Sequence, residues 1–345
     1  MKPKDRDFIK TKEGFFFCVI GYTHPKDRII SYIRYIPKEG GRWAGKYDRM
    51  MPSYNMPNLI RNLDFLRAEY PHYFYESKVF DTTISAVPYS FIQQYYHPDE
   101  KVQRLVKEER RDRLQDACIK LITILSEGTK IPITKFGLTG SVLIDIHHPI
   151  LSDIDIIIYG YKNALRLKEF VKSLYNEDRY IKRLSKDRLE AWCRDKSSSH
   201  PFTIDEARRL YDRKWNYGTF EDYAFSIHPV KSDDEIFEEY GDRSFIGEGM
   251  VRVEGEVCDN REAIFLPYTY HVENVSVKEG KRVDDIREVT SYESLYGDIL
   301  SIGEKFVAYG RLERVLDRKV GEEYHRVLIG SLEANGRDYI KPKDL

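Results

Sequence analysis

The stretch that decides the fold lies near the middle of the chain, where residues 135–160 read KFGLTGSVLIDIHHPILSDIDIIIYG. It contains a Gly140-Ser141 pair and, after eleven further residues, two aspartates, Asp153 and Asp155, that open an apolar run. Aspartate is disfavoured in β-strands, and a buried charge without a partner costs several kcal/mol. Two aspartates at the head of a core strand therefore need a chemical explanation.

The residues ahead of the aspartates predict a turn suited to binding an anion. Residues 131–138 predict a short strand, and residues 142–146 predict a helical turn directly after Gly140 and Ser141. Backbone N–H groups converge at such a helix start, and glycine lets a phosphate approach the main chain closely. Ser141 can add its hydroxyl to that phosphate, but a serine here is also an ordinary helix N-cap.

Asp153 and Asp155 are spaced so that both carboxylates project from one face of a strand. The isoleucines at 154 and 156–158 indicate that this strand runs through a core. A divalent cation would offset both negative charges and turn their repulsion into coordination. The alternative is a strand end where both carboxylates are solvated or paired with lysines. The preceding glycine turn favours the metal site.

This arrangement resembles the nucleotidyltransferase superfamily whose best-known member is DNA polymerase beta. Gly140, Ser141, Asp153 and Asp155 match its pattern of a glycine–serine turn followed by Asp-x-Asp. The resemblance implies transfer of a nucleoside monophosphate from a nucleoside triphosphate (NTP), with pyrophosphate as the leaving group. It further implies that Asp153 and Asp155 hold Mg²⁺ or Mn²⁺ as catalytic metal ligands, while Gly140 and Ser141 bind the triphosphate. Two metal ions roughly 3.5–4 Å apart would stabilise the attacking and leaving oxygens.

Members of this superfamily usually add a third carboxylate from a later strand. The best later strand covers residues 223–230, and Asp222 at its start is the candidate for the third catalytic carboxylate and metal ligand. The centre of the strand offers Ser226 and His228 instead. If Asp222 is not in place, the chain is alternatively a catalytically weak or inactive nucleotide- or RNA-binding protein that retains the fold.

The length of 345 residues and the changes in residue pattern along the chain predict three domains. We expect a mixed α/β domain over 1–98, the nucleotidyltransferase domain over 99–235, and a small β domain over 236–345. The fold class expected is α+β: a central polymerase-beta-like sheet with helices, an N-terminal α/β unit, and a C-terminal β-barrel or sandwich. The last unit either presents nucleic acid, covers the sheet or makes a dimer contact.

Apolar spacing predicts individual elements in these domains. Two N-terminal strands, over 15–20 and 28–36, look like a hairpin. Helices are expected over 56–70, 101–127 and 164–175, the last with Leu165, Phe170 and Leu174 facing inward.

Two basic segments with aromatic residues remain open to two interpretations. In the loop over 38–46, Arg42, Lys46 and the nearby Arg49 either contact phosphate or RNA with Trp43 as a stacking surface, or belong to a solvated turn with a tucked-in tryptophan. The segment 183–215 is either a wall that stacks bases and holds phosphates or a pair of solvated helices. Its basic and aromatic residues are Arg188, Arg194, Arg208, Arg209, Arg213, Lys214, Trp192, Tyr211 and Trp215.

Composition limits the partners and the location. Lysine and arginine number 56 against 57 acidic residues, so a polyanion such as RNA, one of the candidate acceptors, must be bound by a local patch. The sequence has no apolar run of about eighteen residues and no hydrophobic signal-peptide core, which predicts a cytoplasmic protein without a membrane segment. A charged fraction of 33% is typical of thermophilic proteins that use surface ion pairs.

The four cysteines are too far apart for paired zinc ligands and are expected to be buried thiols. They are Cys18, Cys118, Cys193 and Cys258.

Overall fold

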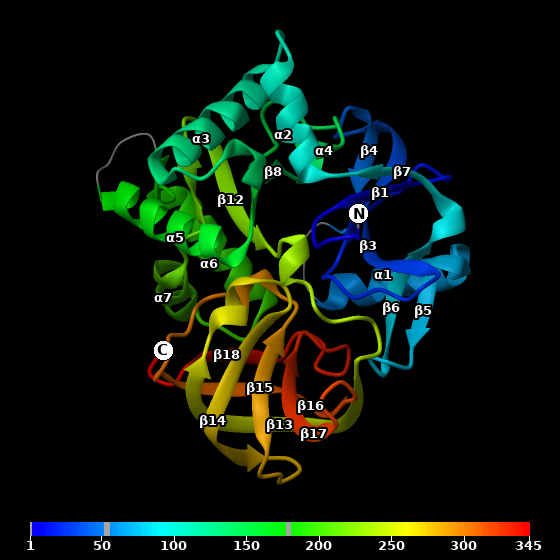
Figure 1. Ribbon diagram of the computed structural model, residues 1–345, viewed down its shortest axis with the longest axis vertical. Helices are drawn as coiled ribbons and strands as arrows, with labels where there is room; N and C mark the ends of the chain where they lie inside the picture. The colour runs from blue at the N-terminus through cyan, green and yellow to red at the C-terminus, as the bar shows by residue number, and fades with distance from the viewer. Residues whose placement is uncertain (1, 52–55, 177–180) are drawn as a thin grey trace.

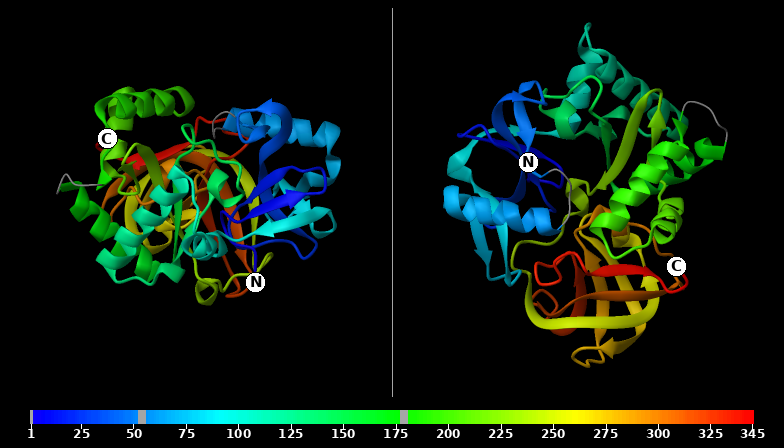
Figure 2. Two further views of the ribbon diagram at one scale, coloured as in Figure 1. Left: turned by 90° about the horizontal axis from the view of Figure 1, so that it is seen from above. Right: turned by 180° about the vertical axis from the view of Figure 1, so that it is seen from behind.

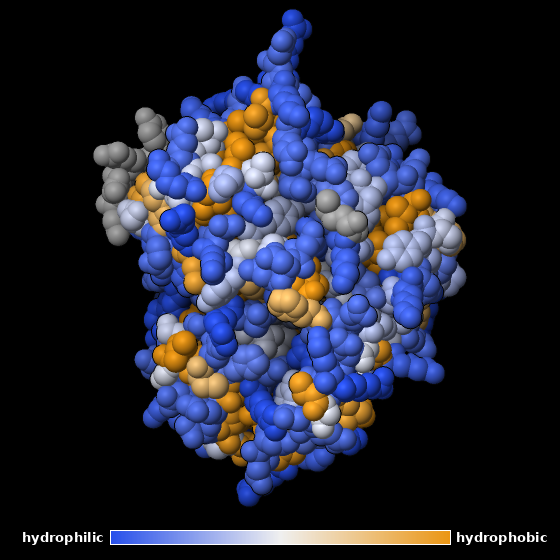
Figure 3. All heavy atoms as spheres, in the orientation of Figure 1, coloured by the Kyte–Doolittle hydropathy of each residue, from blue (hydrophilic) through white to orange (hydrophobic). Residues whose placement is uncertain are grey.

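The computed structural model describes residues 2–51, 56–176 and 181–345. It is a mixed α+β structure whose strands form three sheets, one after another along the chain (Figure 1). The N-terminal sheet and the helical central unit lie side by side, and the C-terminal strands lie against both (Figure 1, Figure 2). Most of the surface in Figure 3 is hydrophilic, with scattered apolar side chains. Within the described residues, no helix is long and apolar enough to cross a membrane.

The N-terminal sheet has seven antiparallel strands in the order β5-β6-β3-β2-β1-β7, with β4 paired to β3. The predicted hairpin is confirmed, because β2 pairs antiparallel with β3. The helix predicted over 56–70 is confirmed as α1 (Met56–Glu69). The strands are β1 (Phe8–Thr11), β2 (Phe16–Val19), β3 (Arg28–Gly41), β4 (Gly45–Arg49), β5 (Phe74–Ser77), β6 (Thr82–Pro88) and β7 (Ile92–Tyr96).

The central sheet has the order β10-β11-β12-β9-β8. Its middle strands, β9 and β12, run parallel, and the isoleucines of β9 at 154 and 156–158 are fully buried, as their run in the sequence predicts. The strands are β8 (Phe136–Leu138), β9 (Ile154–Tyr159), β10 (Ile181–Lys182), β11 (Tyr217–Phe220) and β12 (Tyr223–Val230).

The single helix predicted over 101–127 is wrong, because two helices occupy this region. The Arg111 guanidinium folds back and donates to two backbone carbonyls at the end of the first helix, each at 2.8 Å. Asp112 then caps the second helix by accepting from the Gln115 backbone N–H at 3.0 Å. The charged run thus contains a helix stop and a helix start. The helices are α2 (Pro98–Lys107) and α3 (Arg113–Thr129).

The helix after β9 exists, but its inward face differs from the prediction. Leu165 is 37% exposed, so its inward placement is wrong. Phe170 and Leu174 are partly buried and pack against the core, as expected. The residues of this helix that are fully buried are Ala164, Leu167 and Val171. The remaining helices are α4 (Gly140–Leu143), α5 (Tyr161–Asn176), α6 (Lys186–Ser199) and α7 (Ile204–Arg213).

The C-terminal sheet has six strands in the order β13-β14-β15-β17-β16-β18, and β13 also pairs with β16. Between residues 236 and 345, all of which the structure describes, the chain forms strands and short 3-10 turns without an α-helix, in agreement with the β unit predicted there. The strands are β13 (Arg243–Asp259), β14 (Tyr268–Glu279), β15 (Ile286–Ser291), β16 (Lys305–Asp317), β17 (Glu322–Ile329) and β18 (Tyr339–Pro342).

Three of the four cysteines are buried, as expected, but Cys258 on β13 is exposed. The segment after α4 packs against the N-terminal sheet, where Leu143, Ile144 and Ile146 join a cluster that includes Trp43. The N-terminal sheet is therefore in direct contact with the residues that follow the glycine–serine turn.

Candidate active site

The glycine–serine turn is folded around the carboxylate of Asp155. Gly140 opens α4 with a φ of +66°, a region that glycine adopts without steric cost. A Cβ atom at this position would lie 2.5 Å from Asp155 Oδ2. The Thr139 backbone N–H, just before the turn, donates to the Asp155 carbonyl oxygen at 3.0 Å. This position therefore requires glycine twice, for its conformation and for its lack of a side chain.

Ser141 is held inside the same structure. Its hydroxyl donates to Ser152 Oγ at 3.0 Å, and Ser152 Oγ accepts from the His148 backbone N–H at 2.9 Å. Both serines are buried. Ser141 therefore links the turn to the segment that leads into Asp153.

Asp155 receives a hydrogen bond from the neighbouring strand. Ser226 lies directly opposite Asp155 in the parallel β9–β12 pair, and its hydroxyl donates to Asp155 Oδ1 at 2.6 Å. His228 Nε2 lies 2.7 Å from the same Ser226 oxygen. Since the hydroxyl has one proton and gives it to Asp155, the hydrogen of this second bond belongs to His228 Nε2. The three side chains form a relay that ends on the carboxylate.

The relay keeps Asp155 ionised at neutral pH. Burial raises the pKa of Asp155, but the His228 ring at 3.8 Å from Oδ1, the Ser226 hydroxyl and the charge of Arg34 together bring this pKa well below its usual range. Burial and the charge of Arg6 lower the pKa of His228 to about 4. We therefore describe the pair as a carboxylate beside a neutral imidazole.

Asp153 lies next to Asp155 and remains accessible to solvent. The protein around its carboxyl and the charge of Asp155 raise the pKa of Asp153 to about 6. Arg49, Arg188 and Arg34 act in the opposite direction and favour the ionised form. We refer to Asp153 and Asp155 as the acidic pair. These three arginines lie on other elements and are close enough to the acidic pair to act on the pKa of Asp153.

These arginines come from both sides of the site. Arg34 lies on β3 and Arg49 on β4, so the N-terminal sheet supplies two of them, and α6 supplies Arg188. The Arg49 guanidinium lies 4.7 Å from the centre of the Trp43 ring, which is itself buried. Trp43 thus matches the interpretation of a tucked-in tryptophan. Sequence reasoning did not connect Arg34 or Arg49 with the acidic pair, because only the docking of one sheet on another brings them there.

Most of the basic segment over 183–215 does not face the acidic pair. The buried Lys214 ammonium donates to the carbonyl oxygens of Ser294 and Gly297 at 2.9 and 2.5 Å, and burial lowers its pKa to about 7. The Trp215 indole donates to Asp298 at 2.8 Å. These contacts attach the segment to the C-terminal unit.

Asp222 lies away from the acidic pair. Its side chain is 75% exposed and forms an ion pair with Arg113. Ser226, four residues further along, is the residue opposite Asp155, and four residues of strand span roughly 13 Å. Among the described residues, no group of three or more His, Cys, Asp or Glu side chains is placed to hold a metal ion. The structure brings Gly140, Ser141 and the acidic pair together and leaves Asp222 outside.

Comparisons with known proteins agree with this geometry. The family model described as a nucleotidyltransferase domain matches residues 118–215, which include the turn and the acidic pair. The match ends before β12, so the strand that carries Ser226 and His228 lies beyond it. No solved structure matches the chain.

A full-length relative is found in Methanocaldococcus jannaschii. It is the uncharacterized protein MJ1086, which is 31% identical over 360 residues, an alignment that covers 99% of this chain and all of the relative. The chain therefore belongs to the same family as MJ1086 and contains a nucleotidyltransferase domain of the polymerase beta-like superfamily.

Proposed function

We propose that this protein is a metal-dependent nucleotidyltransferase that moves a nucleoside monophosphate from an NTP to an acceptor and releases pyrophosphate. The observation that carries the proposal is the wrapping of the Gly140 turn around the Asp155 carboxylate, with Asp153 beside it. A glycine without space for a side chain and an aspartate kept ionised by a relay have no evident structural purpose. Both suit a site that binds a metal–triphosphate complex.

The residues present fit Mg²⁺ or Mn²⁺. Mg²⁺ prefers oxygen ligands and is commonly held by one or two carboxylates, with waters and substrate phosphates in the other positions. Asp153 and Asp155 provide two carboxylates. The hydrogen bond from Ser226 occupies only one of the two Asp155 oxygens. When bound, the ion would polarise the α-phosphate as a Lewis acid.

The chain's own residues would bind and orient the triphosphate. Ser226 and His228 hold Asp155 in one orientation and in its ionised form. Arg34, Arg49 and Arg188 supply positive charge beside the acidic pair, where a triphosphate would bring several negative charges. We assign to them the role of binding phosphate oxygens.

The candidate acceptors are RNA ends, other nucleic acids, proteins and small molecules. Residues 236–345 contain 16 lysines and arginines against 23 aspartates and glutamates, which does not favour a polyanion on this unit. We propose that its sheet closes into a small β-barrel through the β13–β16 pairing and serves mainly to cover other parts of the protein. A protein or small-molecule acceptor fits this charge better than RNA.

The decisive experiment measures pyrophosphate release from each NTP with Mg²⁺ or Mn²⁺, in the presence of cellular RNA, protein or metabolite fractions. We expect release with at least one combination, and its loss in the Asp153→Ala plus Asp155→Ala variant. Asp222→Ala is the matched control and should keep most of the activity, because Asp222 is exposed and paired with Arg113. The proposal fails if no combination releases pyrophosphate or if the double variant is as active as the wild type.

The second candidate is a nucleotide-binding protein without turnover. It is favoured by the arrangement of β12, which places Ser226 and not a carboxylate opposite Asp155. Calorimetry that shows tight NTP binding by the wild type, together with zero pyrophosphate release over long incubation, would support this candidate.

A further inference from the structure

A second site lies between the N-terminal and C-terminal sheets. Here the structure contains a cavity of about 430 Å³, a size that suits a small organic molecule. Its lining on the N-terminal side includes the apolar side chains of Ile30, Leu59 and Phe80. On the C-terminal side, the lining includes charged residues from the sheet. We call the N-terminal side, which supplies no charged side chain, the apolar wall, and the C-terminal side, which supplies most of the charged ones, the polar wall. The apolar wall also contains uncharged polar residues such as Thr82 and Ser85, and the polar wall also contains Phe245 and Leu328.

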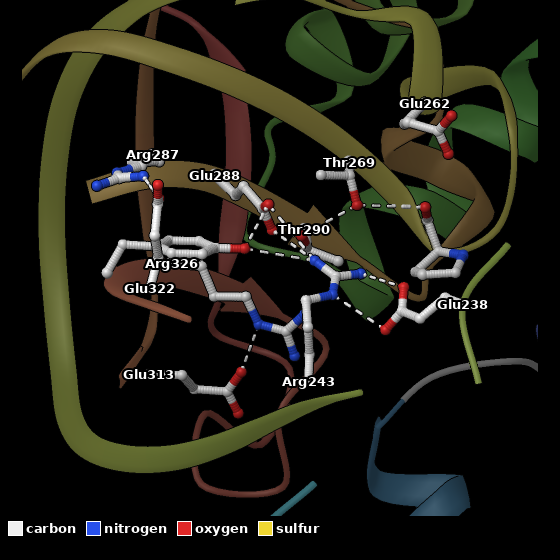
Figure 4. Close-up of polar contacts among 12 residues, drawn as sticks. Glu238, Arg243, Glu262, Thr269, Arg287, Glu288, Thr290, Glu313, Glu322 and Arg326 are labelled. Atoms are coloured by element: carbon white, nitrogen blue, oxygen red, sulfur yellow. Dashed lines mark hydrogen bonds and ion pairs between the residues drawn. The ribbon is translucent and has the colours of Figure 1, made fainter. Parts of the chain in front are cut away.

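The polar wall contains an unusual concentration of buried charge. Glu288, Arg311, Glu313 and Arg326, which we call the Arg–Glu cluster, are each at most 4% exposed. Arg326 Nε donates to Glu313 at 2.7 Å (Figure 4). The hydroxyl of Tyr324 donates to Glu288 at 2.8 Å. Burying charged groups is costly even when they are paired, so such a cluster in a cavity wall marks a candidate functional site.

Arg326 has hydrogen-bonding capacity that the protein does not use. Its Nε atom bonds to Glu313, but its two terminal nitrogens have no hydrogen-bond partner among the residues that the structure describes. The guanidinium carbon lies only 3.5 Å from the centre of the Phe245 ring, which fixes the plane of the group. The terminal N–H groups of Arg326 are not among the fully buried unpaired atoms of the described residues, so they are open to the cavity and can donate to an acceptor bound there.

Tyr292 supplies a second unused donor. It lines the cavity, and within residues 2–51, 56–176 and 181–345 its hydroxyl has no hydrogen-bond partner. Burial raises the pKa of Tyr292, the charges of Arg326 and Arg243 lower it, and the charges of Glu313 and Glu238 raise it, so the Tyr292 hydroxyl lies among both arginines and both carboxylates. Arg243 itself is already engaged by Glu238, with which it forms hydrogen bonds at 3.0 and 2.7 Å (Figure 4).

The chemistry of the wall selects a carboxylate. A guanidinium fork binds carboxylate or phosphate through two parallel hydrogen bonds. Five glutamates line the cavity against one lysine and three arginines, so a doubly charged phosphate would be repelled more than a singly charged carboxylate.

The apolar wall selects the rest of the ligand. Phe80, from the β5–β6 hairpin, stacks on Phe245 with ring centres 5.7 Å apart and an interplanar angle of 6°. The Phe245 backbone N–H donates to the Val79 carbonyl oxygen at 2.8 Å, which ties the hairpin to β13. The hairpin thus closes the cavity with aromatic surface, and Ile30 and Leu59 extend this surface.

We propose that this cavity binds a small molecule with an apolar or aromatic body and a single carboxylate, which the terminal nitrogens of Arg326 and the hydroxyl of Tyr292 hold. The site is separate from the acidic pair, and the proposal does not depend on nucleotidyl transfer.

The test is isothermal titration calorimetry of the full chain with phenylbutyrate and with its neutral amide, phenylbutyramide. We expect saturable one-to-one binding of the acid and at least tenfold weaker binding of the amide. Arg326→Met should weaken binding of the acid at least tenfold. Arg287→Met is the matched control, since Arg287 pairs with Glu322 on the exposed side of the same sheet, and it should bind as the wild type does.

Two further variants keep the test decisive. Leu59→Trp fills the cavity from the apolar wall with Arg326 intact, and it should abolish binding even if Arg326→Met fails to fold. The Asp153→Ala plus Asp155→Ala variant should bind phenylbutyrate normally, which separates this site from the proposed enzyme activity. The proposal is overturned if folded wild-type protein does not bind the acid, if acid and amide bind equally, if phenyl phosphate binds more tightly than the acid, or if Leu59→Trp binds like the wild type.

Discussion

The acidic pair and the Arg–Glu cluster are two ways of keeping charge inside one chain. The acidic pair is built by a short stretch of sequence, in which Gly140 and Asp155 lie fifteen residues apart and in close contact. The Arg–Glu cluster is built by long-range pairing, since β15, β16 and β17 each contribute to it. The acidic pair has an excess of negative charge, and arginines from other elements act on it. The Arg–Glu cluster contains two arginines and two glutamates, and the terminal N–H groups of Arg326 have no partner among the described residues. The difference shows that the acidic pair can be recognised from a short stretch of sequence, whereas the Arg–Glu cluster depends on strand register.

The largest effect is expected from breaking the balance of the Arg–Glu cluster. Arg326→Met removes the 2.7 Å partner of Glu313, which is 1% exposed, and leaves that carboxylate buried. Removing one partner of a buried pair costs about 3–5 kcal/mol of unfolding free energy. Urea unfolding should show this loss for Arg326→Met.

Arg287→Met is the control for this prediction. Its pair with Glu322 is about half exposed on both sides, so its loss should cost less than about 1 kcal/mol. Adding Glu313→Leu to Arg326→Met should recover part of the stability, because it removes a buried carboxylate whose remaining partner is Arg311 at 3.7 Å. Equal losses for the two arginine variants would mean that the cluster is not a buried pair in solution.

The next effect concerns the turn of the acidic pair. Gly140→Ala places a Cβ atom 2.5 Å from Asp155 Oδ2, so the carboxylate must move by roughly 1 Å to reach ordinary contact. A displacement of this size can lower the rate about 10²-fold. Steady-state pyrophosphate release should show a drop of this order in kcat/KM.

Gly45→Ala is the matched control for the backbone. Gly45 has a φ of +64°, close to the +66° of Gly140, but a Cβ there meets nothing within 4 Å. Both variants should lose about 1 kcal/mol of stability from the strained backbone, and only Gly140→Ala should lose activity. If both variants keep full activity, the contact between the turn and Asp155 has no catalytic purpose.

A smaller effect is expected from the relay. Ser226→Ala removes the 2.6 Å hydrogen bond to Asp155 and leaves His228 Nε2 at 3.8 Å from Asp155 Oδ1 without the bridging hydroxyl. Loss of a group that orients a metal ligand typically weakens metal affinity 10- to 100-fold, and we expect the lower end because Arg34 still supports the ionised carboxylate. The midpoint of a Mg²⁺ titration of pyrophosphate release is the measurement. Ser244→Ala, at the same 8% exposure, should leave the midpoint unchanged.

What could be predicted from the sequence follows the same division. The acidic pair and its turn depend on residues close together in the chain, so their types and spacing were sufficient to identify them. Asp222 marks the limit of prediction from local sequence. The strand over 223–230 was located correctly, but the sequence did not determine the register of this strand against β9. Periodicity gives the face of a strand, while only pairing with β9 determines that Ser226 lies opposite Asp155.

The other differences have similar causes. The spacing of apolar residues suggested one continuous helix over 101–127, but the capping by Asp112 outweighed helix propensity and divided it. No sequence pattern predicts the Arg–Glu cluster, because its residues are spaced like ordinary polar residues of β-strands. They come together only when the sheet forms. Docking of domains is equally invisible to periodicity, which is why Arg49 could be noted as a phosphate-binding candidate but not placed beside Asp153.

The smallest expected effect tests that docking. Arg49→Met removes a positive charge that favours the ionised form of Asp153 and that we assign to triphosphate binding. Because Asp153 is accessible to solvent, the interaction is screened, and we expect the KM for the NTP to rise about threefold, or ~0.6 kcal/mol. Arg42→Met, on the same hairpin but exposed, is the control and should leave KM unchanged. The difference between the two variants should shrink as salt is raised, since screening weakens the contribution of Arg49. An equal rise in KM for both would show that the hairpin acts through its overall charge and that Arg49 has no specific place at the acidic pair.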